Sequence, residues 1–156
     1  MEQSTYWSLQ NWGLLGLFIG SFLAATVVPF SSDVLFGGML LAGLNPIGCF
    51  IVATLGNWIG GLTSFGIGWL GKWEWIEKLF HVKHETLDRQ KSRIDKYGAL
   101  LAFMTWLPFV GDVFAIALGF YKLPPIKCGI YMLFSKALRF LLWMAIFYLF
   151  GIQPLL

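Results

Sequence analysis

Four charged residues stand inside long apolar runs of this sequence: Asp33, Asp112, Lys136 and Arg139. An acidic side chain at the centre of a membrane helix costs about 2.5–3.5 kcal/mol on insertion scales, so such residues usually mark an ion or substrate pathway. Carboxylates can take up a proton or a cation, and nearby cations can hold an anion such as phosphate. The four residues are therefore candidates for a transport site, with Asp33 and Asp112 as the pair that responds to protons or ions.

The same residues also have a structural interpretation. Asp33 and Asp112 each follow a proline by four residues, where an Asp side chain can cap the start of a helix. Lys136 and Arg139 lie three residues apart on one helical face, where they can contact an anionic headgroup or balance the aspartates. In the second case the four charges form an internal network that only fixes helix packing. The residues alone leave both interpretations open.

The two aspartates belong to an internal duplication with an offset of 79 residues. Residues 29–34 read PFSSDV and residues 108–113 read PFVGDV. Proline-interrupted apolar segments at corresponding positions of two halves point to the binding site of a repeat-built transporter. We expect Pro29, Pro108 and Gly111 to break the two segments. We expect the path to be lined by Ser31, Ser32, Asn57, Thr105 and Trp106.

The composition excludes an ordinary soluble domain and indicates a membrane protein. Apolar residues make up 58% of the chain and charged residues 12%, and the mean hydropathy is +0.72. Seven of the eleven Lys and Arg residues lie in 72–96, and loops rich in Lys and Arg stay cytoplasmic. The net charge of +3 therefore indicates orientation in the membrane and no nucleic-acid partner. Residues 1–12 lack the features of a signal peptide, so we expect the first apolar run to remain in the mature protein.

Segment lengths predict an all-α integral membrane protein with one domain, residues 1–156, built from two similar halves. Each half is predicted to contain a re-entrant hairpin, because its apolar arms, of about 16–24 Å as helices, are shorter than the bilayer core of about 30 Å. Each hairpin is followed by a transmembrane helix. The first half, 13–71, has its hairpin at 13–44 and its helix at 47–70; the second, 97–150, has its hairpin at 97–121 and its helix at 128–150.

Residues 72–96 are predicted to form an amphipathic helix at the cytoplasmic surface. Because a single span separates the two hairpins, they enter from opposite faces of the membrane, which makes the duplication an inverted repeat. In this arrangement the two hairpin tips approach each other, and Asp33 and Asp112 share one central site.

Small residues recur at every fourth position of the first predicted transmembrane helix, at Gly56, Gly60, Ser64 and Gly68. Such a seam allows close helix packing, either within the chain or in a homodimer. We expect no metal and no cofactor, with Cys49 and Cys128 as buried packing residues, and His81 and His84 on a solvated face. We also expect no enzymatic activity, since neither aspartate has the sequence setting of an intramembrane protease and no Ser or Cys at membrane depth has a His partner.

Four ordered motifs span nearly the whole chain: residues 21–29 (SFLAATVVP), residues 54–63 (TLGNWIGGLT), residues 96–99 (KYGA) leading to residues 106–112 (WLPFVGD), and residues 136–139 (KALR). Together they resemble the DedA family of bacterial membrane proteins, also called VTT-domain or SNARE-associated Golgi proteins, and in particular its YqaA-like branch. The family usually has a Glu at the position of Asp33 and arginines where Thr105 and Gly111 stand. Lys136 and Arg139 are the candidates to replace those arginines.

The resemblance implies a bacterial inner-membrane protein with two facing re-entrant hairpins that moves lipids between leaflets. The implied cargo is a phospholipid or a polyprenyl phosphate, with coupling to protons or Na⁺. Two alternatives remain: a small-ion or metabolite transporter that uses the same cavity, and a membrane scaffold that transports nothing.

Overall fold

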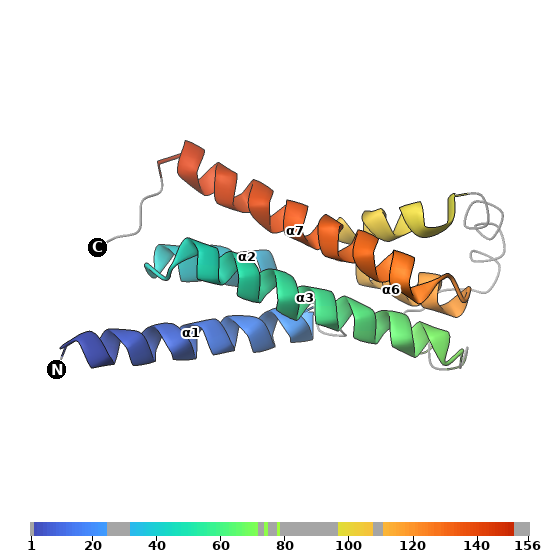
Figure 1. The fold of residues 1–156 in the computed structure, drawn as a ribbon, viewed down its shortest axis with the longest axis horizontal. Coiled ribbons are helices and arrows are strands. Elements are labelled where there is room, and N and C mark those ends of the chain that lie inside the picture. Colours follow the sequence, from blue (N-terminus) through green and yellow to red (C-terminus); the bar gives the residue numbers. More distant parts are fainter. Residues whose placement is uncertain are drawn as a thin grey trace. The chain divides into compact units, whose positions relative to one another are not determined.

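The computed structural model describes residues 2–24, 32–71, 97–107 and 111–151, together with Glu74 and Lys78. All regular secondary structure in this part of the chain is helical (Figure 1), as the sequence predicts. The helices are α1 (Glu2–Ala24), α2 (Ser32–Leu41), α3 (Pro46–Trp69), η1 (Gly98–Trp106), α6 (Gly111–Phe120) and α7 (Pro125–Leu149). Among the described residues, α3 and α7 are the helices that are long and apolar enough to cross a membrane. They coincide with the two predicted spans to within three residues at each end.

The duplication is visible in the helix boundaries as well as in the sequence. Helices α2 and α6 both contain ten residues and begin at 32 and 111. Helices α3 and α7 begin at 46 and 125, which is the same offset of 79 residues. The two cysteines, one in each long helix, are both fully buried.

Both turns that precede a long helix contain a residue in the left-handed conformation. Gly43 has φ of 81° in the first turn, and its counterpart Lys122 has φ of 56° in the second. Glycine adopts this conformation without strain, whereas for lysine it is unusual. In the first turn, Asn45 then caps α3, because its Oδ1 accepts hydrogen bonds from the N–H groups of Ile47 (3.0 Å) and Gly48 (3.3 Å).

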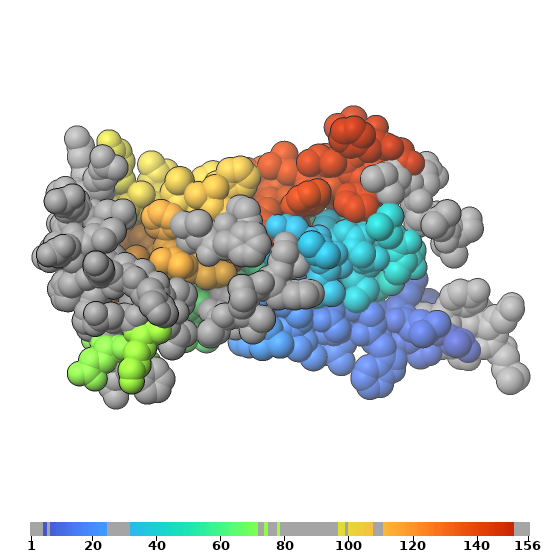
Figure 2. All heavy atoms as spheres, turned by 180° about the vertical axis from the view of Figure 1, so that it is seen from behind, coloured from blue at the N-terminus to red at the C-terminus, as the bar shows by residue number. Residues whose placement is uncertain are grey.

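The chain forms two compact units, of which the first comprises Met1–Gly60 and Lys136–Leu156. In this unit α1 and α2 are antiparallel neighbours, because a Cβ atom at Gly20 would meet Leu35 and one at Gly13 would meet Leu44. Figure 2 shows the atoms of α2 between those of α1 and those of the C-terminal part of α7. The core of this unit consists of Leu17, Phe36, Leu40, Cys49, Ala53 and Phe140.

The second unit comprises Gly61–Ser135, in which η1 packs against α6. Helix α6 also approaches the end of α3 closely: a Cβ atom at Gly119 would lie 1.9 Å from the carbonyl oxygen of Phe65. At the same end, Lys122 Nζ donates a hydrogen bond to the carbonyl oxygen of Trp69 and lies 4.8 Å from the centre of its ring. This lysine therefore satisfies one of the carbonyl groups that the end of a helix leaves without a helical partner.

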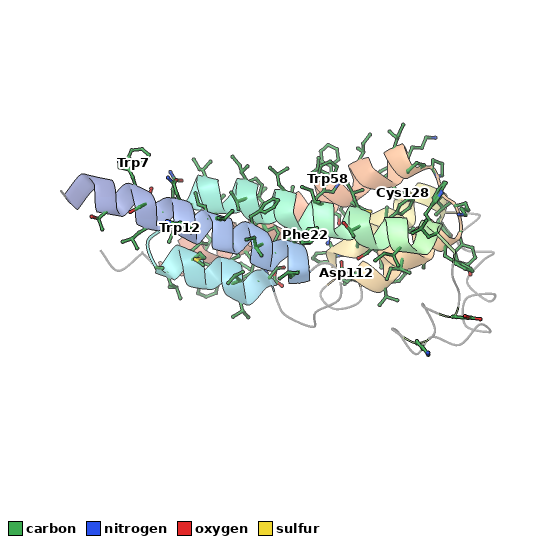
Figure 3. All side chains as sticks on the ribbon, turned by 90° about the horizontal axis from the view of Figure 1, so that it is seen from below. Trp7, Trp12, Phe22, Trp58, Asp112 and Cys128 are labelled. Carbon is green, nitrogen blue, oxygen red and sulfur yellow. The ribbon has the colours of Figure 1, made fainter. Side chains whose placement is uncertain are left out.

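Helix α1 differs from the sequence prediction, since it begins at Glu2 and not at residue 13. The prediction counted long apolar runs only, whereas the mostly polar residues 2–11 include good helix formers, and an acidic first turn is favourable. Trp7 on this segment is exposed and points away from the helix (Figure 3). The predicted helix 72–96, except for Glu74 and Lys78, and its histidines His81 and His84 lie outside the described residues.

Candidate functional site

The side chains of Asp33 and Arg139 form an ion pair in the first unit. Asp33 lies in the first turn of α2, and Arg139 lies on α7. Arg139 Nε donates to Asp33 Oδ1 at 2.8 Å, and Nη2 donates to Oδ2. Two parallel bonds of this kind make the strongest arginine–carboxylate geometry. Both side chains are only 12% exposed, so the structure gives Arg139 the position of a counter-charge to Asp33.

Lys136 lies one helical turn before Arg139 on α7 and is 2% exposed. Lysine is almost never buried to this degree unless it has a partner. Here its Nζ donates a hydrogen bond to Oδ1 of Asn57 on α3. Lys136 and Arg139 thus reach toward α3 and α2, respectively, from adjacent turns of one helix.

Asn57, which is 3% exposed, joins Lys136 to both sides of the break between α1 and α2. Its Nδ2 donates to the carbonyl oxygen of Ser21 at 3.3 Å and to Oγ of Ser32 at 3.2 Å. Ser21 is in the last turn of α1, and Ser32 is the first residue of α2. The Asn57 amide therefore links the end of α1 and the start of α2 to α3.

One turn beyond Asp33, the aromatic rings of Phe36 and Phe140 close the site on one side. Their centroids are 5.1 Å apart and both side chains are fully buried. The Arg139 guanidinium lies 5.9 Å from the Phe140 ring centre, within the range of a cation–π interaction. The ion pair thus borders directly on the apolar core, which keeps water from this side and strengthens the electrostatic attraction.

Two hydroxyl groups in the same unit are buried and have no hydrogen-bond partner among the residues that the structure describes. They belong to Ser21 on α1 and Thr54 on α3. A buried hydroxyl without a partner is costly, and water or an ion commonly supplies the missing bond. Both groups lie on the helices that Asn57 connects.

In the second unit, Asp112 occupies the first turn of α6 (Figure 3), and Asp33 has the same position in α2. Gly111 begins the helix at a close approach, since a Cβ atom there would lie 2.2 Å from the carbonyl oxygen of Thr105. Thr105 is buried, and its hydroxyl bonds to the carbonyl oxygen of Ala102 (2.7 Å) and to Oγ of Ser135 (3.1 Å). Trp106 is partly exposed.

Some predicted site residues are not brought together by these observations. Asp33 and Asp112 belong to different units, so their meeting in one central site stays a prediction. Pro29, Ser31 and Pro108 lie outside the described residues. Ser21 was not among the predicted site residues; the signal for it in the sequence is a hydroxyl residue near the end of the first apolar run.

The seam of small residues on α3 packs within the chain at two of its four positions. A Cβ atom at Gly56 would lie 2.6 Å from the carbonyl oxygen of Phe18, and one at Gly68 would lie 2.0 Å from that of Ile116. Gly60 and Ser64 are also buried. These contacts use the seam for α1 in the first unit and for α6 in the second.

A helical chain with two apolar helices of membrane-spanning length and a buried charged cluster is consistent with an all-α membrane protein. Comparison with the sequences of known proteins identifies its relatives. It is 31% identical to the inner membrane protein YqaA of Escherichia coli over 130 residues, which cover 81% of this chain and 85% of that protein, and the YqaA protein of Shigella flexneri gives the same values. It is also 29% identical to an uncharacterized protein of Haemophilus influenzae over 151 residues, 90% of this chain and 92% of that one.

The chain therefore belongs to the family of the inner membrane protein YqaA. No protein-family profile and no solved structure matches it.

Proposed function

We propose that this protein is a DedA-type lipid translocase of the bacterial inner membrane, which moves a phospholipid or polyprenyl-phosphate headgroup between leaflets and catalyses no reaction. The observation that carries the proposal is the buried cluster of Asp33, Lys136 and Arg139 at the break between α1 and α2. Charged groups at this depth are rare and generally belong to substrate or ion pathways. Membership in a family of inner membrane proteins is consistent with this role.

The position of Asn57 supports a re-entrant first hairpin. Asn57 lies midway along α3 and bonds to both sides of the break. From the break, α2 and the turn that follows it run back to Leu44, which lies against Gly13 of α1. If α3 crosses the bilayer, the break is near the membrane centre, and both arms of the hairpin open to one surface. A hairpin tip at that depth requires protein or water around it, and the hydroxyls of Ser21 and Thr54 are available to bond such water.

The contact between Asn57 and Lys136 supports an inverted repeat. These residues are 79 positions apart, so each is the counterpart of the other in the duplication. A residue meets its own counterpart where two copies face each other about a two-fold axis. Inverted repeats of transporters are related by an axis of this kind in the membrane plane.

The proposed mechanism uses Arg139 and Lys136 for the headgroup and the aspartates for the coupled ion. The fork of Arg139 that now binds the Asp33 carboxylate has the geometry that also binds phosphate. An arriving phosphate would displace Asp33, and the released carboxylate would take up a proton or Na⁺. In this proposal Asp112 also takes up a proton or Na⁺, in the second repeat. The path is lined by Ser31, Ser32, Thr105 and Trp106.

A leaflet-exchange assay tests this function. Purified protein in liposomes with fluorescent phospholipid, and separately with a polyprenyl phosphate, is measured across a pH step. We expect exchange above that of empty liposomes, and we expect Asp33→Asn to slow it about tenfold or more, equivalent to about 1.4 kcal/mol. Glu74→Gln, a change at an exposed carboxylate, is the control. Absence of exchange with both lipids would refute the proposal.

A scaffold function is the second candidate, because each of these three charged groups already has a partner within the protein. Arg139 pairs with Asp33, and Lys136 bonds to Asn57, as expected for a network that only fixes packing. A scaffold would tolerate the uncharged double variant Asp33→Asn with Arg139→Gln, so cells that carry it would grow normally. A transporter of a small ion or metabolite would instead move its solute in liposomes that show no lipid exchange.

A further inference from the structure

The amide of Asn57 has its orientation determined by its neighbours. An ammonium group has three donors and no acceptor, so only the amide oxygen can face Lys136. The NH₂ group must then point to the hairpin, where it meets the carbonyl of Ser21 and the hydroxyl of Ser32. One side chain therefore holds the cation and both sides of the break at a fixed distance from each other.

The same contact joins two positions that are equivalent in the duplication. At such a position, exchanging the two side chains returns the same pair of groups to nearly the same place. The ammonium would then come from α3 and the amide from α7. This exchange moves a charge from one repeat to the other without deleting it.

We propose that Asn57 is a positioning residue, which holds the Lys136 ammonium at the broken end of the first hairpin, and that the two residues are exchangeable. The consequence of this inference for transport rests on the proposed function. That consequence is that Asn57 determines where the phosphate of the cargo lipid meets Lys136. When the ammonium turns to a phosphate, the NH₂ group of Asn57 still holds both sides of the break. The depth of the hairpin therefore stays constant while the cation changes partner.

Three variants test the proposal: Asn57→Ala, Lys136→Asn, and the double exchange Asn57→Lys with Lys136→Asn. Ser64→Ala, at a buried polar residue further along α3, is the control. The rate of lipid exchange is measured at several mole fractions of fluorescent phosphatidic acid. These measurements give the mole fraction at half-saturation and the maximal rate as two separate values. Backbone hydrogen exchange in lipid nanodiscs is measured at residues 22–24 and 33–36.

We expect Asn57→Ala to raise the half-saturating fraction about tenfold and to accelerate hydrogen exchange on both sides of the break about tenfold. Lys136→Asn should keep the slow backbone hydrogen exchange on both sides of the break, since two amides can bond each other, but it should lose lipid exchange. The double exchange restores both quantities to within about threefold, a difference below 1 kcal/mol.

Two results would overturn the proposal. One is a double exchange that moves lipid no better than Lys136→Asn alone. The other is an Asn57→Ala protein with an unchanged half-saturating fraction, as a residue with a purely structural role would give. If the unaltered protein moves no phosphatidic acid, the proposed function fails for this lipid. The hydrogen-exchange measurement then decides on Asn57 alone: protection that is lost in Asn57→Ala and regained in the double exchange supports its positioning role, and any other pattern refutes it.

Discussion

At the scale of single residues, the most informative feature is the pairing of Asp33 with Arg139. An exposed ion pair contributes little, about 0–1 kcal/mol, because water and salt screen it. Removal of one partner from a buried pair costs far more, about 3–5 kcal/mol, because the other charge is left in a medium of low polarity. Both side chains here are 12% exposed and border the core. We therefore expect this pair to behave as a largely buried one.

Arg139→Gln should lower the free energy of unfolding by about 3 kcal/mol, because the Asp33 carboxylate loses its two charge-assisted bonds. Adding Asp33→Asn to this variant should restore most of the loss, since two amides can bond without charge. Reversible unfolding in detergent mixtures gives the free energy of unfolding of the unaltered protein, of each single variant and of the double variant. The four values together give the coupling energy between the two residues. A coupling energy near zero would mean that the pair is screened by water and contributes nothing to folding.

At the scale of helices, glycines allow close contacts between helices in both units. In the second unit, Gly68 of α3 lies against the backbone of Ile116 in α6. In the first unit, Gly37 of α2 lies against the side-chain ring of Phe147 of α7. The two contacts join equivalent positions of the duplication. The glycine lies on the long helix in the second unit and on the short helix in the first. Helix packing in membranes favours such small residues because they let the backbones approach.

Gly68→Ala should destabilise the protein by about 1–3 kcal/mol, because its methyl group would lie 2.0 Å from the Ile116 carbonyl oxygen and the helices would have to separate. Gly66→Ala is the matched control on the same helix, where, among the described residues, no atom outside the local backbone of α3 lies within 4 Å of the added Cβ atom. That change should be neutral or stabilise α3 by about 0.5–1 kcal/mol. Thermal unfolding of both variants gives the comparison, and equal midpoints would contradict the close contact.

At the scale of the whole molecule, the duplication predicts a membrane topology. The turn before α3 and the turn before α7 are equivalent, and both contain a residue with positive φ. In an inverted repeat, equivalent turns lie on opposite faces of the membrane. From the positive-inside rule and the cations of residues 72–96, we expect the turn before α7 to lie on the cytoplasmic side.

Single cysteines at exposed positions test this topology. We expect Ala42→Cys to react with an impermeant maleimide from the periplasm and Lys127→Cys to react only after the cytoplasmic face is opened. The protein with its own Cys49 and Cys128 serves as control, since both thiols are buried and should stay unlabelled. Labelling of both new cysteines from the same face would exclude the inverted repeat.

The sequence alone determined the all-helical class, the two long apolar helices, the offset of the duplication and the charged residues worth testing. These features are local and can be identified directly in the sequence. They are the lengths of the apolar runs, the positions of proline and glycine, and isolated charged residues. The prediction began the first hairpin at residue 13, whereas α1 begins at Glu2, because polar helix formers give no apolar signal.

Only the tertiary structure decided which groups meet. Arg139 pairs with Asp33 across 106 residues, and Asn57 bonds to Ser21, Ser32 and Lys136 at once. Sequence patterns show that these residues are polar in apolar surroundings, but several pairings satisfy that condition equally well. The choice among them depends on helix directions and on contact distances of a few ångströms, which arise only when the close contacts at the glycines and the aromatic core pack together.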